Sequence, residues 1–214
     1  MILGIDVSEN NSYIPWDTLE AEGVKFCYVR CSYGKHGRDE NFKANVDAAH
    51  AHGMLVGAYH YDYSLSIEDA RENAWNCKTA IEEAGVFLEL PVFYDMEDAD
   101  HWKEQHNFPR DPATLPDPDD ADAEDPGWAP DPATVTAMCK AFGKEIGLNW
   151  GVYASYSWLT SAIDWRSLGC PVWNAEWGPE DDISGYVWQW TDNYNGYGID
   201  GNYMYDENLF HNQE

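Results

Sequence analysis

The chain has 214 residues, of which 44% are hydrophobic, enough for one sizeable domain or a compact barrel. Its formal net charge is −27 at pH 7. A surface this acidic repels phosphate backbones, so nucleic acid is not expected as a partner. No run of about 18 apolar residues is present, and we therefore expect no membrane-spanning helix and no membrane partner.

The N-terminus and the cysteines indicate where the protein acts and what it lacks. The opening MILGIDVSENN has no basic stretch followed by an apolar run, so no secretory signal is expected. A protein acting outside the cell would then leave by another route, or its signal has been removed. The five Cys are odd in number and scattered, and no Cys/His pattern indicates zinc. We expect buried thiols, no disulfide framework, no metal and no cofactor.

Short β-rich runs alternate with helical patterns along the first two thirds of the chain. Ser66 is the predicted N-cap of a long helix, and Asp131 followed by Pro132 opens another, which Gly147 ends. The predicted helices lie at 16–22, 41–52, 66–84, 132–146 and 155–163. The predicted strands lie at 2–7, 25–31, 55–61, 90–97, 150–154, 171–176, 186–191 and 202–206.

This order of elements predicts the fold class. Strands that alternate with helices form parallel βαβ units, and eight strands indicate a closed barrel. No convincing helix separates the last three strands. We therefore predict a single domain over residues 1–214, an α/β, TIM-like (β/α)5(β)3 barrel with eight strands and about five helices.

Residues 98–131 form a compositionally distinct segment that holds eleven acidic residues, two basic residues and six Pro. Such a segment cannot bury much apolar surface, so we expect a solvated loop inserted into the domain. It follows the fourth predicted strand directly and therefore lies over the C-terminal rim of the barrel. An inert insertion and a role in a substrate cleft are both compatible with this composition.

Three acidic residues lie where predicted strands end, which is where barrel enzymes place their active sites. Asp6 ends the first strand, and Asp95 and Glu97 end the fourth. Residues two apart on a strand share a face, so Asp95 and Glu97 project together. Two close carboxylates push their pKa values apart, leaving one protonated as a proton donor. Glycoside hydrolysis uses that division of labour.

A D-x-E pattern at a strand end is weak evidence when taken alone. Acidic residues commonly cap helices or face solvent, and carboxylate clusters also bind Mg²⁺ or Ca²⁺. Five segments in register along the chain, two of which contain these acidic residues, strengthen the interpretation. They are GIDVSENN, GAYHY near residue 60, ELPVFYDME near 95, GVYAS near 153 and WQWTDNYNGYGIDGNYMYDENLF at the C-terminal end.

Together these segments resemble the glycoside hydrolase family 25 lysozymes, the Chalaropsis-type N-acetylmuramidases, from about residue 4 to 210. The resemblance implies hydrolysis of the β-1,4 bond between N-acetylmuramic acid and N-acetylglucosamine in bacterial peptidoglycan. It implies Glu97 as the proton donor, accompanied by Asp6, Asp95 and Asp200. The groove residues that it implies are Tyr59, Tyr61, Tyr153, Trp173, Trp188, Gln189 and Trp190.

The resemblance implies a wall-lytic enzyme that acts on the cell wall or outside the cell, and we expect a monomer. Water attack, a covalent intermediate and participation of the substrate acetamide all remain open as mechanisms. A non-catalytic glycan-binding module on the same fold is the main alternative. A metal-dependent deacetylase is a third, although the strand ends supply no His ligands for it. His60 faces away from Tyr59 and Tyr61, and we expect a hydrogen-bonded core residue.

Overall fold

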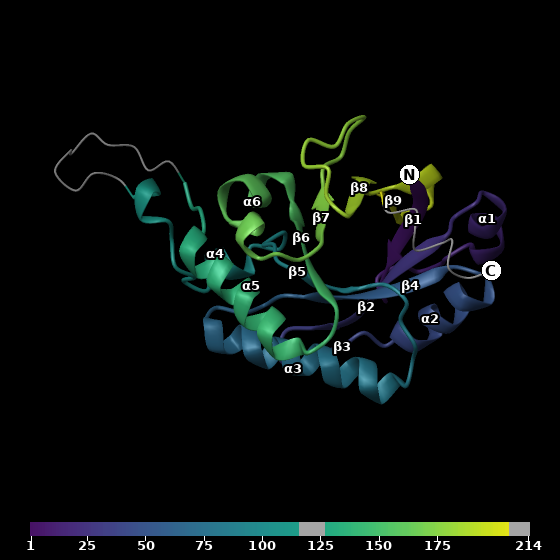
Figure 1. The fold of residues 1–214 in the computed structure, drawn as a ribbon, viewed down its shortest axis with the longest axis horizontal. Helices are drawn as coiled ribbons and strands as arrows, with labels where there is room; N and C mark the ends of the chain where they lie inside the picture. Colours follow the sequence, from purple (N-terminus) through teal and green to yellow (C-terminus); the bar gives the residue numbers. More distant parts are fainter. Residues whose placement is uncertain (116–126, 206–214) are drawn as a thin grey trace.

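Eight strands close into a barrel in the computed structural model, which describes residues 1–115 and 127–205 (Figure 1). The ring runs in the order β1-β9-β8-β7-β6-β5-β4-β2, and the pairing of β1 with β2 closes it. A ninth strand, β3 (Gly37–Arg38), pairs only with β2. The predicted α/β barrel is therefore confirmed. The barrel strands are β1 (Ile2–Val7), β2 (Phe26–Tyr33), β4 (Leu55–Tyr61), β5 (Val92–Asp95), β6 (Trp150–Ser155), β7 (Val172–Ala175), β8 (Val187–Thr191) and β9 (Asp200–Met204).

Six α-helices lie among the described residues, one more than the sequence predicts, and α3 and α5 pack against each other along one side (Figure 1). Ser66 accepts the N–H of Asp69 at 3.1 Å, and Asp131 accepts that of Thr134 at 3.1 Å, so both predicted caps are confirmed. The unpredicted helix is α4. The helices are α1 (Trp16–Ala21), α2 (Phe42–Ala51), α3 (Ile67–Ala84), α4 (Trp102–Gln105), α5 (Pro132–Ile146) and α6 (Tyr156–Ser161).

The last strand runs against the direction of the others. β9 pairs antiparallel with both β8 and β1, whereas the other neighbouring pairs of the ring are parallel. An antiparallel strand needs only a short return from its predecessor, so no crossover helix is required between β8 and β9. The prediction of a strand at 202–206 was shifted by two residues, and Asp206 lies outside the described residues.

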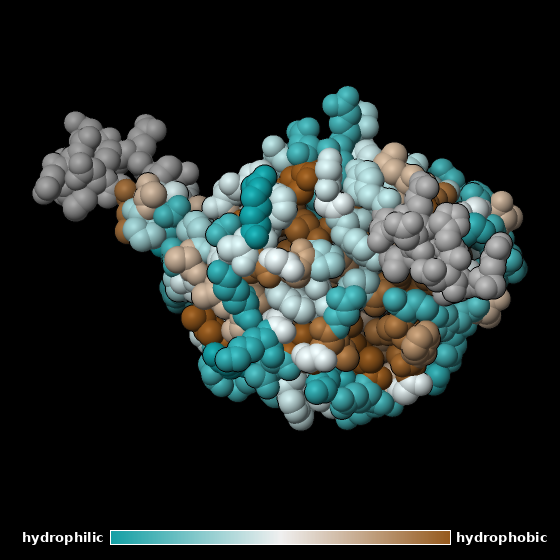
Figure 2. All heavy atoms as spheres, viewed as in Figure 1, coloured by the Kyte–Doolittle hydropathy of each residue, from teal (hydrophilic) through white to brown (hydrophobic). Residues whose placement is uncertain are grey.

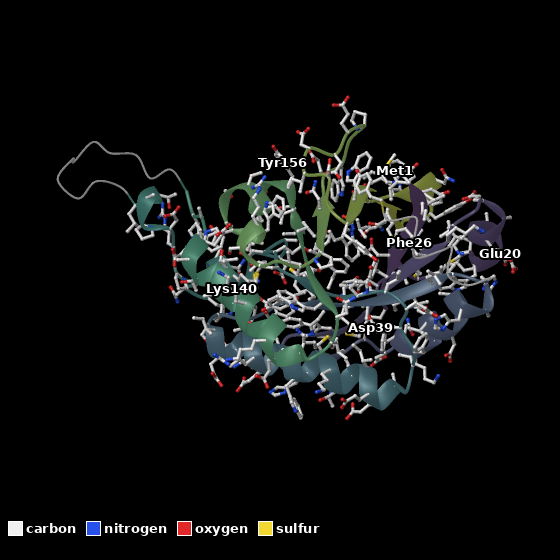
Figure 3. The ribbon with its side chains drawn as sticks, in the orientation of Figure 1. Met1, Glu20, Phe26, Asp39, Lys140 and Tyr156 are labelled. Atoms are coloured by element: carbon white, nitrogen blue, oxygen red, sulfur yellow. The ribbon has the colours of Figure 1, made fainter. Side chains whose placement is uncertain are left out.

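Alternation along the strands divides the apolar residues into two cores. One core lies between barrel and helices, and Figure 2 shows apolar residues in brown gathered in the middle of one face, with hydrophilic residues in teal around them. The second core fills the barrel, where Phe26 is labelled in Figure 3. Inside it, the ring of Tyr28 lies 5.1 Å from that of Phe93 and 4.7 Å from that of Trp173.

Inward-facing glycines make room for these rings. A Cβ at Gly57 would lie 2.2 Å from the ring of Tyr28. A Cβ at Gly151 would lie 2.4 Å from the ring of Phe93. Any larger residue at either glycine would displace the ring layer on which the carboxylates at the strand ends rest.

The described part of the acidic segment, residues 98–115 and 127–131, is not solvated throughout. Lys103, on α4, is fully buried, and Phe108 is 3% exposed. Residues 111–115 stand away from the barrel in Figure 1. Most residues of 98–110 are exposed, but the short helix α4 and the two buried side chains were not expected, because composition averaged over the segment hides them.

The prediction for His60 is confirmed, and the prediction of buried thiols is confirmed for four of the five Cys. His60 is buried, with Nδ1 2.8 Å from the hydroxyl of Ser32 and Nε2 2.7 Å from Oδ1 of Asn73, and burial lowers its pKa to about 4. All five Cys are free thiols, four of them buried and Cys170 partly exposed.

Within the described ranges, no helix is long and apolar enough to cross a membrane.

Candidate active site

A cavity of about 270 Å³ opens at the C-terminal ends of the parallel strands. Residues from all eight strands of the barrel line it, Asp200 from β9 among them. All four predicted carboxyl residues therefore reach one cavity, from β1, from β9, and from β5 and the segment just beyond it. They are Asp6, Asp95, Glu97 and Asp200.

Asp6 and Asp200 face each other directly across the β1–β9 pair. Burial, and then the charge of Asp6, raise the pKa of Asp200 to about 9, so at neutral pH Asp200 keeps its proton and donates it to Asp6. Burial also raises the pKa of Asp6, against hydrogen bonds from two amides. Those donors are the Nδ2 of Asn202 at 2.8 Å and the Nε2 of Gln189 at 3.0 Å.

Asp95 and Glu97 form the second carboxyl pair, on the inward face of β5 and just beyond it. Burial raises the pKa of Glu97 to about 7, and the charges of Asp100 and Asp6 act in the same direction. Burial and the charge of Glu97 raise the pKa of Asp95 well above its usual range. Oδ1 of Asp95 is buried and has no hydrogen-bond partner among the described residues. Near neutral pH, therefore, Glu97 is present in both its protonated and its ionised form, and a small change in pH shifts the balance between them.

The charge of Lys103 acts on both members of this pair, and sequence reasoning missed this residue. Its Nζ donates to the carbonyl oxygens of Glu97 at 2.6 Å and Asp62 at 2.9 Å, and lies 3.3 Å from Oδ2 of Asp62. The positive charge lowers the pKa of Glu97, which opposes the effect of burial. Lys103 thus fixes the backbone that carries Glu97 and tunes its acidity. A lone Lys in an acidic run carries no local signal of such a role.

The predicted groove residues fall into two groups, those whose side chains face the inside of the barrel and those whose side chains face outward. Tyr59, Tyr61, Tyr153, Trp173 and Gln189 all line the cavity. Trp188 and Trp190 flank Gln189 on β8 and therefore face the other way.

The placement of those two rings in the cavity was wrong. The Nε1 of Trp188 donates to the carbonyl oxygen of Glu176 at 2.7 Å, and the ring of Trp190 stacks 5.7 Å from that of Tyr203. Only Gln189 of the Trp-Gln-Trp run points inward, where its Oε1 accepts from the hydroxyl of Tyr153 at 3.2 Å.

Arg30 lines the cavity, and sequence reasoning missed it as well. Its guanidinium pairs with Oε1 of Glu9 at 3.1 Å and Oδ2 of Asp39 at 3.0 Å. The signal was present, because Phe26, Tyr28 and Arg30 alternate inward along β2, and a charged residue in that series marks the barrel mouth.

The sequence of the chain matches the profile of "Glycosyl hydrolases family 25" over residues 5–199. The chain belongs to this family. The four carboxyl groups therefore lie in the barrel mouth of a family 25 glycoside hydrolase.

Three known proteins illustrate the family relationship. Lysozyme M1 of Streptomyces globisporus is 35% identical over 60 residues, a match that spans 28% of this chain and only 20% of that lysozyme. The bacterial lysozyme from Streptomyces coelicolor has the same fold with a TM-score of 0.70 and 20% identity, covering 98% of this chain and 94% of that one. The modular autolysin LytC from Streptococcus pneumoniae, solved with a synthetic peptidoglycan ligand, aligns with a TM-score of 0.73 and 20% identity over 95% of this chain and 46% of its own.

Proposed function

We propose that this family 25 enzyme is a peptidoglycan hydrolase, an N-acetylmuramidase that cleaves the β-1,4 bond between N-acetylmuramic acid and N-acetylglucosamine. The observation that carries the proposal is Glu97, a carboxyl group with a pKa of about 7 in a cavity with three further carboxyl groups. Family membership and the lysozymes among its relatives support the choice of substrate. We further propose that residues 1–214 act as one catalytic domain, as a monomer, on the cell wall after secretion or phage-type release.

Each carboxyl group has a separate role in this proposal. Glu97 donates its proton to the leaving glycosidic oxygen as the bond to the anomeric carbon breaks. Asp6, supplied with hydrogen bonds by Asn202 and Gln189, offers negative charge to the cation-like sugar of the transition state. Asp95, in the wall of the same cavity, can orient a polar substrate group. Asp200 stays protonated, so that it does not repel the negative charge of Asp6.

The rate should fall above neutral pH. A general acid must be protonated in the free enzyme, so kcat/KM follows the protonated fraction of Glu97 and declines tenfold per pH unit above about pH 7. The measurement is a rate profile from pH 4 to 9 on a soluble glycan fragment at constant ionic strength. A profile that stays flat to pH 9 would exclude a carboxylic acid as the donor.

Digestion of purified peptidoglycan tests the proposed function itself. The enzyme should release soluble fragments, each with one new reducing end, and release should continue with time at a fixed low enzyme concentration. A non-catalytic glycan-binding module would sediment with the wall and release none. That outcome would replace the enzyme assignment by the alternative.

A further inference from the structure

The cavity continues into a trough that leads away from the carboxyl groups. A second hollow of about 430 Å³ shares Asn10, Arg30 and Tyr61 with the walls of the cavity. A third, of about 380 Å³, shares Tyr33, Tyr63 and Asp100 with the second and ends at Trp102. The shared residues place the three hollows next to one another, in a row from the carboxyl groups to Trp102. We call the part beyond Tyr61 the aromatic trough, lined by Tyr33, Tyr63, Asp100 and Trp102.

The rings of the aromatic trough hold one another in place. The ring of Tyr63 lies 5.0 Å from that of Tyr61, 6.5 Å from that of Tyr33 and 5.4 Å from that of Trp102. The hydroxyl of Tyr63 donates to Oδ2 of Asp100 at 2.8 Å. Rings that are already ordered lose little conformational entropy when a ligand binds.

Trp102 is fixed on two sides. Its Nε1 donates to the carbonyl oxygen of Tyr63 at 3.2 Å, and its ring stacks on that of His106 with centroids 3.5 Å apart. The ring is still 36% exposed and lines the third hollow. Trp102 and Lys103 are neighbours on α4, so one short turn of the acidic segment supplies both the end of the trough and the clamp on Glu97.

The chemistry of the trough fits sugars better than peptides. Sugar rings present apolar C–H faces that pack on aromatic rings, and hydroxyl edges that bind groups such as the carboxylate of Asp100. The stem peptides of peptidoglycan carry carboxylates, which need cations. Arg30 is already paired with Glu9 and Asp39, and Lys35, at the far end, lies 2.9 Å from Oε2 of Glu72.

We propose that the aromatic trough binds the glycan strand beyond the sugars that flank the cleaved bond, with Trp102 as the ring on which a distant sugar packs. This inference rests on the proposed function, because the strand that runs along the trough is the one that Glu97 cleaves. It assigns to the acidic segment a role in selecting long strands. Stem peptide is the competing occupant.

The test compares Trp102→Ala with Trp75→Ala on peptide-free glycan strands of increasing length. Trp75 is a matched control because it is 61% exposed on α3 and lines none of the hollows described above. For Trp102→Ala, the ratio of kcat/KM on long strands to kcat/KM on short ones should fall about tenfold, as expected when one aromatic anchor is lost. Trp102→Phe should restore most of that ratio, and Trp75→Ala should leave it at the wild-type value.

The outcomes separate the subsite from the proposed function. If the wild-type enzyme cleaves no strand, the proposed function fails. If it cleaves strands but Trp102→Ala keeps the wild-type ratio, the subsite fails and the function stands. The same strands with their stem peptides attached are assayed in parallel, and a loss confined to them would overturn the glycan assignment. The pH profile of kcat/KM controls for a local change in the fold. If its alkaline limb lies at the same pH in Trp102→Ala as in the wild type, Lys103 still contacts the backbone of Glu97, and unfolding of α4 does not account for the loss.

Discussion

Replacing Glu97 by Gln should lower kcat by about 10² to 10⁴, because the amide cannot donate a proton to the leaving oxygen. The fold should survive, since Gln has nearly the shape of Glu and removes a charge that burial disfavours. The measurement is turnover on a soluble glycan fragment at pH 5 and 7. Glu82→Gln, an exposed position on α3, is the matched control and should keep wild-type turnover.

Stability gives a second, independent readout of the same variant. The pKa of Glu97 is raised in the folded protein, so the stability that its protonated form contributes is present below about pH 4.5 and is lost as pH rises through about 7. Gln does not ionise, so the Glu97→Gln variant does not lose this stability as pH rises. Its melting temperature should equal that of the wild type at pH 4 and exceed it at pH 8.

Turnover of Glu97→Gln above half of the wild-type value would show that another group is the acid.

Replacing Lys103 by Met should reduce the free energy of unfolding by about 3–5 kcal/mol, as expected when one partner of a buried ion pair is removed. The side chain of Asp62 is also fully buried and would be left without its cation. The hydroxyl of Tyr94 still donates to Oδ1 of Asp62 at 2.6 Å, so a folded variant is expected. Denaturant melts measure the loss, and Lys140→Met, exposed on α5 and labelled in Figure 3, is the control.

Two further results would identify the cause of that loss. Adding Asp62→Asn to Lys103→Met should recover part of the stability, because the uncompensated charge is gone. The alkaline limb of kcat/KM should move to higher pH in Lys103→Met, since Lys103 lowers the pKa of Glu97. If Lys103→Met stays within about 1 kcal/mol of wild type, the ammonium is not a buried, paired charge.

Sequence patterns within one strand predicted which side chains share a face of that strand. Strand parity predicted that Tyr59, Tyr61, Asp95 and Glu97 face one way, because side chains alternate along any strand regardless of its neighbours. The same rule, applied to β8, would have excluded Trp188 once Gln189 was assigned inward. That error came from matching a whole motif to the groove without applying the alternation.

What the sequence could not predict depends on contacts between distant segments. The pairing of β9 with β1, which closes the barrel, joins strands from opposite ends of the chain. Lys103 reaches Asp62 and the carbonyl oxygen of Glu97 only because α4 folds back onto the barrel. In an acidic, Pro-rich stretch no periodicity marks that contact.

The identity of the new reducing ends tests the central claim most directly. Peptidoglycan digested with the wild-type enzyme is reduced with borohydride, hydrolysed and analysed by mass spectrometry, with Glu97→Gln digested in parallel. Cleavage by an N-acetylmuramidase predicts reduced muramic acid at the new ends with the wild type and almost none with Glu97→Gln. Reduced glucosamine at those ends, or equal yields from the two proteins, would contradict the account.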